Sequence, residues 1–373
     1  MKPTPRLAGV LLLALIVYFY GSSSQVSWLF LLSFWILALV GVAYVYARWS
    51  SAGIRAEVKV KAARPGPASP LADLPASWVR SGPQLPVFEG DTIEVELLLR
   101  ARSARGPARL SGSLAGASMT AATGLVPATG WAAVREAGPV GRGPLEAASW
   151  TLETGDHMGL YREVRLTEGR EVCLALPLFD SLADAVHVRE LEASLAAPRA
   201  GAGSEVFGVR EYRRGDSLRR IHWRSSARRG ELVAREYEPP GLHLLGLFLD
   251  PRPRSRAAAD QVARLAASEA WDCLRMGGRV VAWAPGLEPT GLRESRSLWS
   301  ILGWLARYPD CDAGDGEPPA VAEAVLFTTG KRPELVDALH SLRRTGARAR
   351  AWAVGGAADL GVPMRSAGLK WPL

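Results

Sequence analysis

The side chains most able to do chemistry gather between residues 209 and 238, in the segment VREYRRGDSLRRIHWRSSARRGELVAREYE. It holds nine arginines and five acidic residues, together with His222 and Trp223. Guanidinium groups bind carboxylates and phosphates through paired hydrogen bonds. The segment therefore predicts either an internal ion-pair network that organises a docking surface, or a surface for anions or nucleic acid. We favour the first, because the acids are interleaved with the arginines.

Within this segment, Gly215 and Asp216 are typical of a turn, and Ile221 and Trp223 are typical core anchors. We predict that a set of charged, aromatic and turn residues forms the binding or organising cluster of the protein. Its members are Arg210, Glu211, Tyr212, Gly215, Asp216, Arg220, His222, Trp223 and Arg228.

Catalysis is not indicated by these residues. Ser217, His222 and Asp216 suggest a hydrolase triad only by sequence proximity, which carries no weight because triads are defined by geometry. The chain has no G-x-S-x-G elbow, H-E-x-x-H helix or phosphate-binding glycine loop in a convincing context. We expect no catalytic residue, no enzymatic activity and no cofactor.

Composition excludes a disordered chain and a metal or redox site built on cysteine. Hydrophobic residues make up 48% and charged residues 22% of the 373 residues, with a net charge of +8. Cys173, Cys273 and Cys311 are far apart and form no C-x-x-C pair, so we expect isolated thiols.

Two apolar stretches near the start predict a transmembrane hairpin. Leu7 to Tyr20 and Val26 to Ala47 are almost wholly apolar, and a spanning helix needs about 20 such residues. Residues 21–25 (GSSSQ) are predicted to form the turn between them. Cations flank the outer ends of the pair, whereas the turn has none. The positive-inside rule then places both ends in the cytoplasm of a bacterial inner membrane. A cleaved signal peptide is the alternative for the first stretch.

The secondary-structure pattern predicted for the remaining chain changes once. From Ile54 to about Leu178, short alternating segments separated by Gly and Pro predict a β-sandwich-like domain; 65–86 is predicted to be a loop. From Leu244 onward, strands alternate with helices predicted at 257–276, 298–308 and 333–344. This alternation predicts a doubly wound parallel sheet. Ligands bind beyond the carboxyl ends of the strands in such a sheet, which directs attention to Asp250.

The arginine-rich segment resembles the signature of the domain of unknown function 58 family. The matching positions are Arg210, Tyr212, Gly215, Asp216, Arg220, Ile221, His222, Trp223, Ala227, Arg228, Leu232 and Glu236. The stretches at 89–91, 141–146 and 155–161 are similar to other parts of the family pattern, although His157 and Met158 replace a Pro-Phe pair. The resemblance implies a membrane anchor, a von Willebrand factor A-like domain and association with a MoxR-type AAA ATPase.

That resemblance also raises the question of a metal at Asp250. A working von Willebrand A domain binds Mg²⁺ through D-x-S-x-S, because Mg²⁺ requires oxygen ligands. Here Arg252 and Arg254 replace both serines and supply no oxygen. We therefore expect a degenerate site without metal, in which Asp250 pairs with Arg252 or Arg254.

These observations predict a membrane-tethered interaction or scaffold protein of envelope or complex assembly. Its expected parts are a transmembrane hairpin at 1–50, a β domain at 54–180, the arginine-rich segment at 181–241 and an α/β domain at 242–373. The expected partners are the lipid bilayer and a MoxR-type ATPase or an envelope protein, and no nucleic acid. The alternatives are a hydrolase-type enzyme that acts on an envelope component, and a binder of anionic ligands or nucleic acid.

Overall fold

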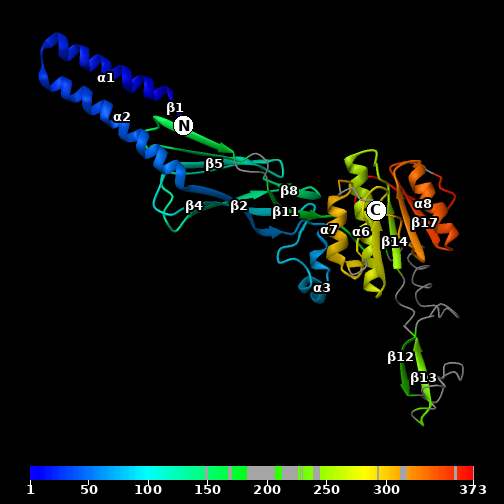
Figure 1. Cartoon of the computed structure of the whole chain (residues 1–373). Coiled ribbons are helices and arrows are strands. Elements are labelled where there is room, and N and C mark those ends of the chain that lie inside the picture. Colours follow the sequence, from blue (N-terminus) through cyan, green and yellow to red (C-terminus); the bar gives the residue numbers. More distant parts are fainter. Residues whose placement is uncertain are drawn as a thin grey trace. The chain divides into compact units, whose positions relative to one another are not determined.

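The computed structural model divides into two compact units, residues 1–176 and 177–373, which we describe separately (Figure 1). The described residues are 1–147, 150–166, 170–182, 206–211, 226, 228, 230–237, 244–291, 294–310, 317–356 and 359–372. Within 206–211 and 233–237 only the backbone is described.

The first unit begins with two helices, α1 (Pro5–Ser24) and α2 (Ser27–Gly53), that pack against each other as a hairpin (Figure 1). Both are long and apolar enough to cross a membrane by length and composition. Most of their large side chains are exposed, including Phe34 and Trp35. A surface of this kind is unfavourable in water and is typical of contact with lipid.

The turn of the hairpin is tighter than predicted, so the expectation of a turn over residues 21–25 is wrong. Helix α1 continues to Ser24, because the hydroxyls of Ser23 and Ser24 donate back to the carbonyl of Tyr20. The chain reverses at Gln25, which adopts the left-handed conformation with φ 55°. Serine hydroxyls that bond to a preceding carbonyl let the helix tolerate these residues.

The base of the hairpin is fixed to the β-rich part of the same unit. The short strand β1 (Lys2–Pro3) pairs with β10 (Tyr161–Leu166), and the Thr4 N–H donates to the Leu160 carbonyl at 2.9 Å. Leu7, Ala43 and Leu160 form a small buried cluster. This strand was not predicted from the sequence.

The β-rich part contains three sheets around one core. Its other strands are β2 (Ile54–Arg64), β3 (Val87–Phe88), β4 (Thr92–Ala101), β5 (Ala108–Leu114), β6 (Ala117–Thr123), β7 (Trp131–Ala137), β8 (Gly143–Glu146), β9 (Thr151–Gly155) and β11 (Glu171–Leu176). The sheets have the orders β1-β10-β9-β5-β6, β3-β11-β8 and β2-β4-β7. As predicted from alternation, one face of β4, formed by Ile93, Val95, Leu97 and Leu99, is fully buried. A single hydrophobic cluster joins residues of all three sheets.

Two predictions for this part need correction. The region 65–86 is not a plain loop, because it contains a 3-10 turn at Pro70–Ala72 and the helix α3 (Ala76–Arg80). The stretch 145–153 is not one strand: it forms the end of β8 and the start of β9, which lie in different sheets. Trp150 lies between them with no exposed surface, and its ring covers Gly112.

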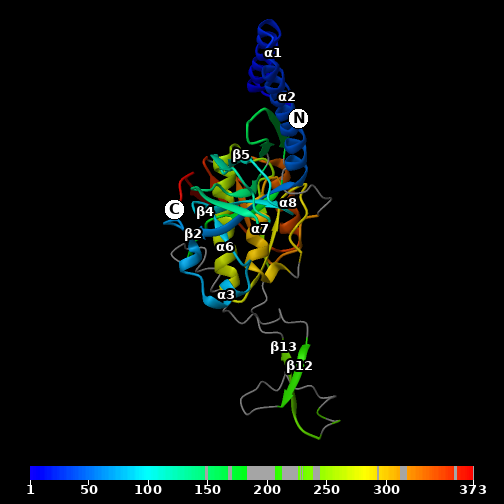
Figure 2. The same cartoon turned by 90° about the vertical axis from the view of Figure 1, so that its left-hand side faces the viewer.

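The second unit contains a five-stranded parallel sheet of order β15-β14-β16-β17-β18. Its elements are β14 (Leu244–Leu249), α6 (Arg256–Arg275), β15 (Arg279–Trp283), a 3-10 turn (Glu294–Arg296), α7 (Leu298–Arg307), β16 (Glu323–Thr328), α8 (Pro333–Arg344), β17 (Arg348–Val354) and β18 (Met364–Ala367). Helices α6 and α7 lie on one side of the sheet and α8 on the other (Figures 1 and 2). The predicted parallel sheet is therefore confirmed, and β18 was not predicted.

Before this sheet, β12 (Val206–Glu211) and β13 (Val233–Tyr237) form an antiparallel pair within the second unit. Residues 180–182 also belong to this unit by their bonds. The Asp272 carboxylate on α6 accepts from the Ser181 hydroxyl at 2.9 Å and from the Leu182 N–H at 2.7 Å. Burial raises the pKa of Asp272 in spite of these donors, so the ionised form of this carboxylate is less favourable here than in water.

We predict that Gly112→Ala destabilises the first unit. A Cβ at this position would lie 2.4 Å from a ring carbon of the fully buried Trp150, which cannot move away within a packed core. Overpacking of this kind costs about 1–3 kcal/mol. The thermal unfolding temperature of the full chain in mild detergent should fall. Gly124→Ala is the matched control, because nothing lies within 4 Å of its added Cβ. Equal unfolding temperatures for the two variants would contradict the packing argument.

Candidate functional site

The topology of the parallel sheet defines where a ligand would bind. The chain passes from β14 to β15 on one side and then to β16 on the other, so the strand order reverses between β14 and β16. In an open α/β sheet, the crevice at such a reversal lies beyond the carboxyl ends of the strands. Asp250 follows β14 directly, and Thr329 follows β16. These are the residues that face each other at this edge.

Asp250 is fully buried and every lone-pair direction of its carboxylate is occupied. One oxygen accepts from the backbone N–H of Arg252 at 3.0 Å and from Nε of Arg332 at 3.0 Å. The other accepts from the N–H of Thr329 at 3.0 Å and from its hydroxyl at 2.6 Å. These donors leave the carboxylate no free acceptor position for a further ligand.

The partner of Asp250 differs from the prediction. We expected Arg252 or Arg254, but the guanidinium that contacts the carboxylate belongs to Arg332, at the start of α8. Arg252 contributes its backbone N–H, while its side chain pairs with Glu334. One physical reason is competition, since the Arg252 side chain is already paired with Glu334. The start of α8 approaches it from the neighbouring strand.

The pairing of Asp250 with Arg332 decides whether a metal ion could bind at this position. The Arg332 guanidinium lies against the Asp250 carboxylate that a cation would need, and it supplies positive charge and no oxygen. Among the described residues, no group of three or more His, Cys, Asp or Glu side chains is placed to hold a metal ion. The residues present therefore do not fit Mg²⁺ at Asp250.

Arg254 lies across the carboxyl edge of the sheet. A Cβ added at Gly330 would lie 2.8 Å from one of its terminal nitrogens, and a Cβ added at Gly356 would lie 3.1 Å from the other. Its backbone N–H donates to the Thr329 hydroxyl at 3.2 Å. Its side chain is exposed and has no hydrogen-bond or ion-pair partner among the described residues. The two glycines thus leave room for a guanidinium that is free to bind an anion.

The predicted arginine-rich cluster is described only in part. Arg210 and Glu211 are the last two residues of β12, where they pair with Ala234 and Val233 of β13. Arg228 is exposed. Six members of the predicted cluster lie outside the described residues: Tyr212, Gly215, Asp216, Arg220, His222 and Trp223. The prediction that these residues form one cluster stays a prediction.

The described cysteines are poorly suited to chemistry. Burial, reinforced by Glu323 and Glu269, raises the pKa of Cys273 to about 12. Burial, reinforced by Glu171, raises the pKa of Cys173 to about 11. The thiolate is the reactive form, so both thiols are weak nucleophiles at neutral pH. His157 has a different role, because its Nε2 lies 3.0 Å from the Tyr46 hydroxyl of α2.

Sequence reasoning missed Arg332 as a site residue. It is separated from Asp250 by 82 positions, and no spacing rule links the two. A signal existed in the stretch Thr328-Thr-Gly-Lys-Arg-Pro333, where a basic residue stands between a buried strand and a helix-starting proline. In a parallel sheet such a position lies at the ligand edge.

Comparison with known proteins shows which part of the chain is similar to a protein family. Residues 208–284, which include β12, β13 and β14 with Asp250, match the sequence model of the family described as "Protein of unknown function DUF58". A curated relative, "Uncharacterized protein YeaD" of Bacillus subtilis (strain 168), is 28% identical over 224 residues. The match covers 56% of this chain and 55% of the relative, so the chain spans about half of the relative's length. These matches support a DUF58-family region in this chain at residues 208–284.

One solved structure is also similar at a low level. It is a cycloisomaltooligosaccharide glucanotransferase of Paenibacillus sp. complexed with cycloisomaltoheptaose, 10% identical, with 81% of this chain and 46% of that chain covered. The TM-score is 0.13, and a likeness at that level carries no argument about fold or function.

We predict that Arg332→Leu strongly destabilises the second unit. The substitution leaves the fully buried Asp250 carboxylate without its cation, and removing one partner of such a pair costs about 3–5 kcal/mol. The unfolding temperature should fall, whereas Arg344→Leu, an exposed arginine on the same helix, should change it little. The double variant Asp250→Asn/Arg332→Leu should recover part of the loss. A rise in the wild-type unfolding temperature on addition of Mg²⁺ would contradict the conclusion that Arg332 takes the place of a metal ion at Asp250.

Proposed function

We propose that this chain is a membrane-tethered interaction protein that works by binding rather than by catalysis. The observation that carries the proposal is the exposed guanidinium of Arg254, which lies at the ligand edge of the sheet beside an Asp250 carboxylate already bound by Arg332. Such an edge supplies a fixed cation for an acidic group of a partner. It offers no nucleophile or general base among the described residues that contact it.

The proposed tether is the α1–α2 hairpin, placed in the bacterial inner membrane. Its support is the apolar, mostly exposed surface of two helices of spanning length. Lys2 and Arg6 precede the hairpin and Arg48 and Arg55 lie at its other end, while the turn is uncharged. By the positive-inside rule, the β-rich part and the second unit lie in the cytoplasm.

The proposed docking unit is a von Willebrand A-like domain in which an arginine takes the place of the metal. Its support is the position of Asp250 after the first strand of the sheet and of Thr329 after the third. A bound Mg²⁺ would present positive charge to an acidic ligand at such an edge. A guanidinium binds a carboxylate through two parallel hydrogen bonds, so Arg254 suits the same kind of ligand.

The proposed partner is a MoxR-type AAA ATPase or an envelope-assembly protein that presents an acidic group. The choice of this class rests on the family association alone. The chemistry of the edge adds one requirement, which is an Asp, a Glu or a carboxyl terminus at the centre of the partner's contact surface.

The placement of the hairpin predicts the location of the carboxyl terminus. Alkaline phosphatase fused after Leu373 should be inactive, and green fluorescent protein fused at the same position should fluoresce, because only the cytoplasm favours the second reporter. As a control, inserting either reporter after Gln25 should reverse the pattern. Phosphatase activity at Leu373 would overturn the proposed orientation, and release of the chain by alkaline extraction of membranes would overturn the tether.

We predict that Arg254→Ala weakens docking without loss of stability. When the chain is co-expressed with the MoxR-type ATPase of the same organism and purified in mild detergent, the ratio of ATPase to chain should fall about tenfold, because a charge-assisted contact is lost. Arg344→Ala, which removes an exposed cation from α8, is the matched control. Arg220→Ala/Arg228→Ala tests the arginine-rich segment in the same assay. An unchanged ratio in Arg254→Ala would remove the docking role of the sheet edge.

A further inference from the structure

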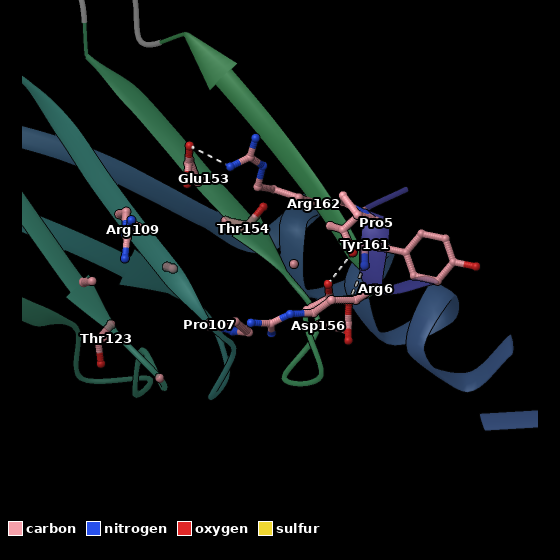
Figure 3. A pocket seen from close by; sticks show the side chains of 16 residues that line it. Pro5, Arg6, Pro107, Arg109, Thr123, Glu153, Thr154, Asp156, Tyr161 and Arg162 are labelled. Atoms are coloured by element: carbon pink, nitrogen blue, oxygen red, sulfur yellow. Dashed lines mark hydrogen bonds and ion pairs between the residues drawn. The ribbon is translucent and has the colours of Figure 1, made fainter. Parts of the chain in front are cut away.

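The first unit contains a hollow of about 630 Å³ at the point where α1 begins (Figure 3). Its walls come from the start of α1, the ends of β5 and β6, and the turn that joins β9 to β10. No part of the proposed docking site contributes to it. Its volume lies in the range of pockets that bind small organic molecules.

Cations dominate the rim of this pocket. Arg6, Arg109 and Arg162 all line it and all are exposed. Arg162 pairs with Glu153 at 3.5 Å. The side chains of Arg6 and Arg109 have no hydrogen-bond or ion-pair partner among the described residues. Two guanidinium groups are therefore free to bind an anion.

The first turn of α1 adds to the positive potential. Thr4 stands at the N-cap, but its hydroxyl donates to the carbonyl of Gly159 at 2.6 Å and does not cap the helix. The first turn holds no acidic residue, and Pro5 occupies the first helical position. The N-terminus of a helix of 20 residues carries about half a positive charge. Its uncapped end lies at the pocket through Pro5 and Arg6.

The two carboxylates of the pocket are already engaged. Asp156 is buried, and its oxygens accept from the N–H of Met158 at 2.9 Å and from the N–H of Tyr161 at 2.6 Å. Glu153 is held by Arg162. These acids fix the turn and the rim, and the three arginines of the pocket outnumber them, which leaves an excess of positive charge.

The walls and the position indicate the source of the anion. Pro5, Pro107 and Ala122 make part of the lining apolar. Arg6 immediately precedes Leu7, where the apolar surface of the hairpin begins. If the hairpin spans the bilayer as proposed, the pocket lies at the level of the lipid headgroups. We propose that it binds a phosphate group, held by Arg6 and Arg109, and that this phosphate belongs to an anionic phospholipid.

The test uses the full chain in a mild, uncharged detergent. Native mass spectrometry counts the lipid molecules retained after addition of phosphatidylglycerol or phosphatidylcholine at equal concentration. The wild type should retain one phosphatidylglycerol in preference. Arg6→Gln/Arg109→Gln should weaken that retention about tenfold or more. Arg80→Gln/Arg102→Gln removes the same charge from exposed positions outside the pocket and is the control.

A competition arm separates the two sources of phosphate. Inorganic phosphate and glycerol 1-phosphate, added in millimolar excess, should not displace the lipid if the apolar wall contributes to binding. Displacement by either would overturn the lipid as the source. Equal retention of both lipids, or equal loss in the pocket and control variants, would overturn the site itself. Alkaline extraction of the same variants from membranes reports the tether separately, so failure of the pocket is distinguishable from failure of the membrane placement.

Discussion

The bond between the Asp250 carboxylate and the Arg332 guanidinium is the constraint on which the second unit depends. It joins the end of β14 to the start of α8, and Thr329 extends it to the end of β16. Three elements are thereby fixed at the point where the strand order reverses. Because a buried carboxylate requires a cation, the fold could have used a metal ion here. The chain supplies the cation itself, at the first residue before a helix.

A guanidinium and a metal ion confer different properties on such an edge. Metal binding depends on the supply of the ion and on ligand protonation. An arginine is always present and always charged, so an edge built around it is independent of the ionic environment. Its contacts are also directional, since the planar group matches a carboxylate in one plane. This difference suits a surface that holds a partner over one that exchanges ligands.

Local patterns in the sequence predicted local structure well. Alternation from Ile93 to Leu99 matches the buried face of β4, and the helix predicted at 333–344 has the bounds of α8. Contacts between distant segments were not predictable. Nothing near Lys2 indicates that it pairs with β10, and no spacing rule connects Asp250 to Arg332. The hairpin turn was misplaced because serine composition indicates a loop, whereas serine hydroxyls bonded to Tyr20 extend the helix.

The hairpin joins the β-rich part without a hinge. Helix α2 ends at Gly53 and β2 starts at Ile54, while β1 and Thr4 are bonded to β10 and Leu160 just before α1 begins. Both legs are therefore clamped to one rigid body. Any tilt of the helices must therefore rotate the β-rich part with them. If the hairpin spans the bilayer as proposed, the tilt of its helices would set the orientation of the β-rich part.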